Sequence, residues 1–372
     1  MNKLKLLALT GLMALTYLPP SISAAQLPYD TIIFFGDSLS DNGNFFHRTM
    51  GYVPKSPPYF EGRFSNGPIW SELVAEHYKE KNRVEADNYA VGSSSAIFHN
   101  PAKGYLPYTL KMAVYNYLVR YTGYDKTHTL YTIWIGANDY FYGADDVDNA
   151  TDAVMDGLSG NIESLINRGG KYFLLMNLPD IGKTPYGRDN GDAEIISALI
   201  VEHNRKLAIL VDKLQKENPD ITIRLYDIYN DFVSLTNDPD AYNKKYNIHL
   251  TDLSESCWPG GYTLKRNRQI EQDALTQDIK DYWQQNGKPL TRSNAPTYDN
   301  ADQLAATIMN TPALTAAYDV AKQYKEGQKS CTNPDNHVFW DKVHPSRVVH
   351  NTFSLIMIDY IDQNFNKISR PK

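Results

Sequence analysis

"TIIFFGDSLSDNGNFF" spans residues 31–46 and sets four apolar, β-forming residues directly before Gly36, Asp37 and Ser38. Such a run predicts a buried strand over residues 30–36, and the missing side chain of Gly36 lets the backbone bend where the strand ends. Ser38 therefore stands at the carboxyl end of a strand. It is either part of a turn or a nucleophile, since a serine hydroxyl becomes reactive once a base takes its proton.

The rest of the chain alternates strand-like and helix-like segments. Further strands are predicted at 83–90, 128–136, 171–179 and 221–228, and amphipathic helices at 67–80, 152–170, 192–219 and 344–365. This βαβ alternation predicts an α/β protein of flavodoxin-like, three-layer α/β/α architecture, with a central, mostly parallel five-stranded sheet and helices on both faces. In such sheets the functional groups collect at the carboxyl ends of the strands.

The pattern breaks over residues 237–336, which are polar and rich in Pro, Gly, Asn and Lys. We interpret residues 25–372 as a single domain, with 237–336 as an insertion, a lid or a small subdomain before the C-terminal Asp-His block. Both cysteines, Cys257 and Cys331, lie inside the insertion. An even pair in an exported protein suggests a disulfide, and two separate buried thiols are the alternative.

The N-terminus has the pattern of a secretory signal peptide. Lys3 and Lys5 form a basic region, residues 6–18 are mostly apolar, and the small residues Ala24 and Ala25 follow. We predict a signal peptide over residues 1–24 and export of the mature protein. The 372-residue chain has a formal net charge of −6 and lacks a basic stripe, which argues against nucleic acid as a partner.

A base for Ser38 is found near the C-terminus. His344 lies three residues after Asp341, in "FWDKVHPS", so a short turn can place the carboxylate on one ring nitrogen and leave the other for Ser38. An acyl-transfer reaction also needs donors for an oxyanion. Gly92, after the second strand, and Asn138, after the third, are candidates, although Gly and Asn are also common in turns.

Together these segments resemble the GDSL family of lipases and acylhydrolases, also called SGNH hydrolases. The matching motifs occur in the family's order between residues 31 and 347: "FFGDSLSDNGN", "GRFSNGPIW", "NYAVGSSSA", "IWIGANDY", "LPDIGKTP", "HNRKL" and "DKVHPS". The resemblance implies the SGNH fold, with Ser38 as nucleophile, His344 as base and Asp341 orienting the base. It implies oxyanion donors from the Ser38 N–H, Gly92 and Asn138, and no metal or organic cofactor.

Within the family, the chain is similar to bacterial secreted phospholipases and glycerophospholipid:cholesterol acyltransferases. This similarity implies a phospholipid or lysophospholipid substrate, cholesterol as an acyl acceptor, transient contact with a membrane surface and a Gram-negative source. It also implies that a protease activates the enzyme by cutting the Cys257–Cys331 loop. The stretch "GYVPKSPPYF" (51–60) is a candidate lining of an acyl groove, or a plain loop.

Three alternatives remain open at this point. "GSSSA" (92–96) half-resembles a nucleophile elbow with Ser94 as the nucleophile, although it lacks the second glycine. The same triad would serve a secreted esterase that acts on short-chain or carbohydrate esters. A non-catalytic surface domain is the third alternative, and the intact set of Ser38, Asp341 and His344 argues against it.

Overall fold

The computed structural model describes residues 27–51, 53–100, 105–141, 144, 146–190, 192–259, 271–287, 300–310, 315, 318 and 327–366. The predicted signal peptide, residues 1–24, lies outside the described residues. In the described part of the chain, no helix is both long enough and apolar enough to cross a membrane.

The core of the molecule is a five-stranded sheet in the order β2-β1-β3-β4-β5. Its strands are β1 (Thr31–Gly36), β2 (Glu85–Asn88), β3 (Thr129–Trp134), β4 (Tyr172–Met176) and β5 (Thr222–Tyr226). All four neighbouring pairs are parallel. Each strand lies inside a segment predicted from the sequence, and β1, β3 and β4 are buried almost throughout. The predicted α/β architecture is confirmed.

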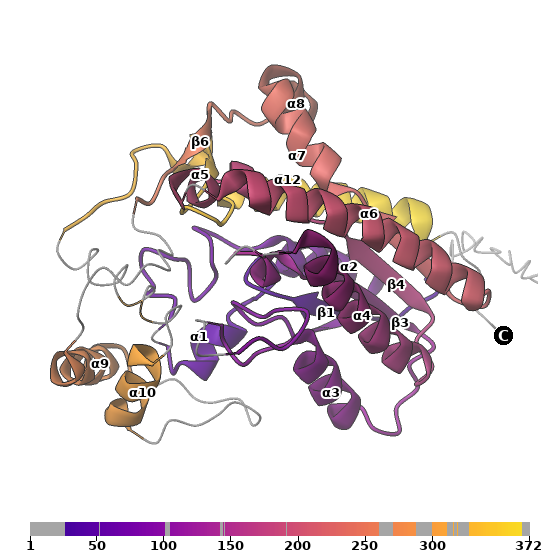
Figure 1. The fold of residues 1–372 in the computed structure, drawn as a ribbon, viewed down its shortest axis with the longest axis horizontal. Helices are drawn as coiled ribbons and strands as arrows, with labels where there is room; N and C mark the ends of the chain where they lie inside the picture. The colour runs from indigo at the N-terminus through magenta and orange to yellow at the C-terminus, as the bar shows by residue number, and fades with distance from the viewer. Residues whose placement is uncertain are drawn as a thin grey trace, which may run out of the picture.

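Helices cover both faces of this sheet (Figure 1). Successive side chains of a strand point to opposite faces. On β1, Phe34 packs against Trp70 of α2 (Trp70–Asn82), whereas Phe35 packs against Tyr117 of α3 (Leu110–Arg120). The C-terminal helix α12 (Arg347–Asn364) packs on α2, while α4 (Val147–Ile166) contacts both α3 and α6 (Ala193–Glu217). The result is a three-layer α/β/α arrangement.

The remaining helices of the described residues are short or belong to the insertion. They are α1 (Asn44–Arg48), α5 (Pro185–Asn190), α7 (Ile228–Asn237), α8 (Pro239–Tyr246), α9 (Gln272–Asn286) and α10 (Ala301–Met309). The 237–336 segment is therefore more regular than its polar composition suggested. In α9 the apolar side chains of Leu275, Ile279 and Tyr282 follow helical spacing, but the charged and amide residues between them hide the pattern.

Helices α9 and α10 pack against each other and lie to one side of the main sheet, in orange in Figure 1. Their apolar faces share a core with Phe45, Val53 and Phe64, which come from the segment after β1. A second, two-stranded parallel sheet pairs β6 (Asp252–Ser256) with β7 (His337–Phe339). Strand β7 ends two residues before Asp341, so this small sheet positions the Asp-His block at the edge of the main sheet.

Candidate active site

Ser38, His344 and Asp341 are joined by hydrogen bonds. His344 Nε2 lies 2.8 Å from Ser38 Oγ, and His344 Nδ1 lies 2.8 Å from Asp341 Oδ2 and 3.0 Å from Asp341 Oδ1. One ring nitrogen thus faces the hydroxyl and the other faces the carboxylate. This is the geometry in which an imidazole can take a proton from a serine while a carboxylate fixes its orientation.

The carboxylate of Asp341 is fully buried and richly hydrogen-bonded. Oδ1 accepts the backbone N–H groups of Val343 at 2.8 Å and His344 at 2.7 Å, and Oδ2 accepts the hydroxyl of Tyr59 at 2.6 Å. Burial acts to raise the pKa of Asp341, but the neighbouring His344 and these donors outweigh it and hold the pKa below its ordinary value. Asp341 therefore stays ionised when the imidazole becomes charged.

The glycine before Ser38 is required by close packing at the end of β1. A Cβ on Gly36 would lie 2.6 Å from the carbonyl oxygen of Trp134 at the end of β3. Directly after it, the side chain of Asp37 accepts the Leu39 N–H at 3.0 Å and closes a turn that presents Ser38. Burial raises the pKa of Asp37 to about 7 despite this bond.

Two of the three predicted oxyanion donors, Gly92 and Asn138, follow β2 and β3, at the same edge of the sheet as Ser38. The Asn138 side chain lines the cavity next to Ser38, and its Nδ2 donates to the carbonyl oxygen of Ser94 at 2.8 Å. The Gly92 N–H donates to Asp41 Oδ2 at 2.7 Å. To bind an oxyanion, the Gly92 N–H would have to leave this carboxylate, so its role stays a prediction.

The hydrogen bonds distinguish Ser38 from the alternative nucleophile. The His344 ring contacts the hydroxyl of Ser38. Ser94 instead accepts a hydrogen bond from the Asn138 side chain through its backbone carbonyl oxygen. Ser94 is also 96% buried, since only 4% of its surface is exposed. The arrangement favours Ser38 as the group that an ester carbonyl would meet.

Phe64 covers one face of the catalytic imidazole. Its ring stacks on that of His344 with centroids 5.1 Å apart and an interplanar angle of 29°. A Cβ on Gly92 would lie 2.4 Å from Phe64 Cε2, so glycine at position 92 leaves room for this aromatic side chain. Because Phe64 belongs to the core shared with α9 and α10, the insertion supports the His344 ring from behind.

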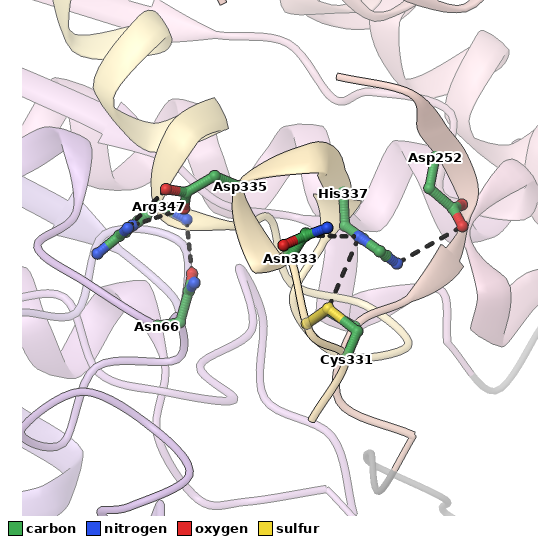
Figure 2. The surroundings of a disulfide bond; sticks show 8 residues. Asn66, Asp252, Cys331, Asn333, Asp335, His337 and Arg347 are labelled. Atoms are coloured by element: carbon green, nitrogen blue, oxygen red, sulfur yellow. Dashed lines mark hydrogen bonds and ion pairs between the residues drawn. A yellow bond between two sulfur atoms is a disulfide. The ribbon is translucent and has the colours of Figure 1, made fainter. Parts of the chain in front are cut away.

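Cys257 and Cys331 form a disulfide, which confirms the pairing suggested by the sequence. The Cys257 N–H donates to the Phe339 carbonyl at 3.0 Å, so the disulfide is tied to β7 just before the Asp-His block. Figure 2 shows His337 beside it, with Nδ1 3.7 Å from Cys331 Sγ and Nε2 3.5 Å from Asp252 Oδ2. Among the described residues, Cys257, Cys331 and His337 have metal-ligand spacing, but the disulfide leaves no thiolate to bind an ion.

A match to a family model shows which protein family the chain belongs to. The model described as GDSL-like Lipase/Acylhydrolase matches residues 32–355, which contain Ser38, Asn138, Asp341 and His344. The chain belongs to this family.

Two curated relatives are similar to this chain, and the name of the first refers to a phospholipid and a sterol. This GDSL protein is 29% identical over 361 residues to the phosphatidylcholine-sterol acyltransferase of Aeromonas hydrophila, with 96% of each chain covered. It is 32% identical over 238 residues to the thermolabile hemolysin of Vibrio parahaemolyticus, covering 60% of this chain and 51% of that protein. Among solved structures, the acetyl xylan esterase AlAXEase aligns with a TM-score of 0.32 and 18% identity over 56% of this chain and 84% of that chain.

Sequence reasoning missed two residues that contact the triad of this GDSL protein, Tyr59 and Phe64. Tyr59 lies in the stretch 51–60 that was a candidate acyl-groove lining, but its hydroxyl faces Asp341, 282 positions away. None of the described residues of that stretch lines the cavity at Ser38. Neither contact has a local sequence signal, because both depend on how the segment after β1 folds back onto the C-terminal block.

Proposed function

We propose that this protein hydrolyses the acyl esters of phospholipids and lysophospholipids through an acyl-enzyme on Ser38, and that it transfers the acyl chain to cholesterol when this sterol is present. The observation that carries the ester chemistry is the hydrogen-bond chain from Ser38 through His344 to Asp341. The choice of lipid rests on the likeness to a phosphatidylcholine-sterol acyltransferase over 96% of both chains.

The first half of the proposed mechanism forms the acyl-enzyme. Ser38 Oγ attacks the ester carbonyl carbon while its proton passes to His344 Nε2, and Asp341 stabilises the imidazolium through Nδ1. The oxyanion is held by the Ser38 N–H, the Asn138 amide and the Gly92 N–H, which leaves Asp41 Oδ2 to reach it. When the tetrahedral intermediate collapses, the glycerol oxygen leaves with the proton from Nε2, and the acyl chain stays on Ser38.

The second half releases the acyl chain. Water or the sterol hydroxyl attacks the acyl-enzyme, His344 Nε2 accepts its proton, and this proton returns to Ser38 Oγ as the product departs. Water yields a fatty acid and the sterol yields a steryl ester. No step requires a metal or an organic cofactor.

Product analysis tests the proposal. Purified mature protein is given labelled phosphatidylcholine or lysophosphatidylcholine with and without cholesterol, and Ser38→Ala serves as the control. Fatty acid alone supports the hydrolase part and contradicts the acyltransferase part, whereas steryl ester that depends on Ser38 supports both. Cleavage of short-chain esters without any lipid product contradicts the lipid assignment and favours the short-chain or carbohydrate esterase.

The proposal extends to export and to proteolytic activation. Export through the signal peptide at residues 1–24 would place the enzyme outside the cell, where it meets membrane surfaces; N-terminal sequencing of the secreted protein tests cleavage near Ala24 or Ala25. Cutting the loop between Cys257 and Cys331 would raise the activity. Equal specific activity of the intact and cut proteins would contradict the activation step.

A further inference from the structure

A largely apolar cavity opens beside the nucleophile and extends away from it, and we name it the acyl cavity. Its empty space, including the opening to solvent, is about 970 Å³. Ser38 and Asn138 lie at one part of its wall, whereas Ile228, Phe232 and Leu235 contribute from α7. The cavity therefore connects the reacting hydroxyl with the helix that follows the last strand of the sheet.

The order of the strands gives the distance between the carboxyl ends of β1 and β5, which the acyl cavity bridges. Ser38 follows β1, and α7 follows β5, which lies three strands away across β3 and β4. With neighbouring strands about 4.8 Å apart, this distance is about 14 Å. Carbon–carbon bonds of about 1.5 Å in a zig-zag chain fill that span with roughly a dozen carbons.

The wall of the cavity suits an alkyl chain. Ile228, Phe232 and Leu235 stand at helical spacing on one face of α7, opposite Val338 and Phe339 of β7. Phe232 and Phe339 contact each other edge to face, with ring centroids 6.3 Å apart. Such surfaces gain free energy from each methylene that leaves water, and offer no partner to a polar group.

Two of the carboxylates in the wall are hydrogen-bonded within the protein. Asp180 accepts the hydroxyl of Ser197 at 2.6 Å, and Asp231 accepts the hydroxyl of Tyr226. Burial lowers the pKa of His350 to about 3, so its ring is uncharged. A sugar or a headgroup would find few unused partners here, whereas a hydrocarbon needs none.

Leu235 lies in the part of the cavity wall that α7 forms. It is only 3% exposed and packs in a small core with Leu250, Val338 and Phe339. This core backs the cavity beneath the second half of α7. A larger side chain at position 235 would fill part of the cavity at α7.

From these observations we infer that the acyl cavity binds the fatty-acyl chain of the substrate, with its carbonyl at Ser38 and its methyl end beneath α7, and that Leu235 limits the chain length. This inference rests on the proposed ester chemistry but not on the identity of the headgroup. The site favours acyl chains of medium length, up to roughly a dozen carbons.

The test is a series of p-nitrophenyl esters from acetate to palmitate, assayed below their aggregation limits. For the unmodified protein, kcat/KM should rise by up to about fourfold per methylene and level off near dodecanoate. Leu235→Trp should lower the dodecanoate-to-butyrate ratio of kcat/KM at least tenfold. Phe232→Ala, which enlarges the cavity, should move the plateau to longer chains and covers the case in which Leu235→Trp does not fold.

Ile209→Trp is the matched control, since Ile209 is 55% exposed on α6 and should leave the profile unchanged. Identical chain-length profiles in the unmodified protein and both cavity variants would overturn the inference. The headgroup proposal is tested separately. If kcat/KM rises with acyl-chain length and levels off, but phosphatidylcholine is not cleaved, only the phospholipid assignment is contradicted. If phosphatidylcholine is cleaved but kcat/KM does not change with acyl-chain length, only the role of the acyl cavity is contradicted.

Discussion

The hydroxyl of Tyr59 offers a sharp test of how the catalytic acid is positioned. Tyr59→Phe removes the 2.6 Å hydrogen bond to Asp341 Oδ2 and leaves the carboxylate with the donors from Val343 and His344. The ring and its contact with Trp340, at a centroid distance of 6.4 Å, are retained. The change is therefore confined to one charge-assisted hydrogen bond.

A hydrogen bond to a buried charge contributes about 1.5–3 kcal/mol, so the free energy of unfolding at pH 7 should fall by that amount. If about 1.4 kcal/mol of this stabilisation is also lost from the transition state of the acyl-transfer reaction, kcat falls about tenfold. KM for a soluble ester should change less than twofold, because Tyr59 does not line the acyl cavity. Steady-state kinetics and urea unfolding measure these quantities.

The pH dependence separates an electrostatic role from a packing role. The pKa of Asp341 is lowered in the folded protein, so its ionised form contributes stability that is present above the ordinary value and lost as the pH falls through the folded value. The stability deficit of Tyr59→Phe should therefore be full at pH 7 and shrink below about pH 4.

Tyr78→Phe is the matched control, since the buried Tyr78 hydroxyl donates to Asp362 Oδ1 at 2.7 Å, away from the triad. It should lower stability and leave kcat unchanged. An unchanged kcat in Tyr59→Phe, or a deficit that is the same at pH 7 and at acid pH, would refute the positioning role.

Three further predictions concern the residues around the triad. Asn138→Ala should lower kcat on a soluble ester about 10²–10³-fold with little change in KM, and a loss below threefold would argue against an oxyanion role. Replacing Cys257 and Cys331 together with Ser should lower the free energy of unfolding by about 2–5 kcal/mol in urea titrations, and an unchanged midpoint would contradict this. Because the pKa of Asp37 is raised to about 7, the folded state binds its proton more tightly, so this group makes stability fall as the pH rises from about 4 to 7. Asp37→Asn should remove that part of the slope, and parallel stability curves for the two proteins would contradict the raised pKa.

The sequence predicted the parts of the molecule whose signals are local. The apolar runs of β1, β3 and β4 and the amphipathic helix α6 are long and well bounded, and each was placed within a few residues. Ser38 and the pair Asp341–His344 were also accessible, because a strand end and a three-residue spacing are visible in the chain itself.

The parts that were missed depend on distant contacts. Helix α9 is stabilised by packing on Phe45 and Phe64, and its own sequence is too polar to predict a helix. The Tyr59–Asp341 bond joins residues 282 positions apart. The bond from the Gly92 N–H to Asp41 also has no local signal, because it forms where the turn after β1 brings that buried carboxylate against the loop after β2. The oxyanion role of Gly92 stays a prediction.

The most direct test of the account is to find the acyl group on the enzyme. Protein that is turning over phosphatidylcholine is quenched in acid, digested and examined by mass spectrometry, with Ser38→Ala and Ser94→Ala treated in parallel. The account predicts an acyl adduct on the peptide that contains Ser38, present in Ser94→Ala and absent in Ser38→Ala. An adduct on the Ser94 peptide, or turnover that persists in Ser38→Ala, would contradict it.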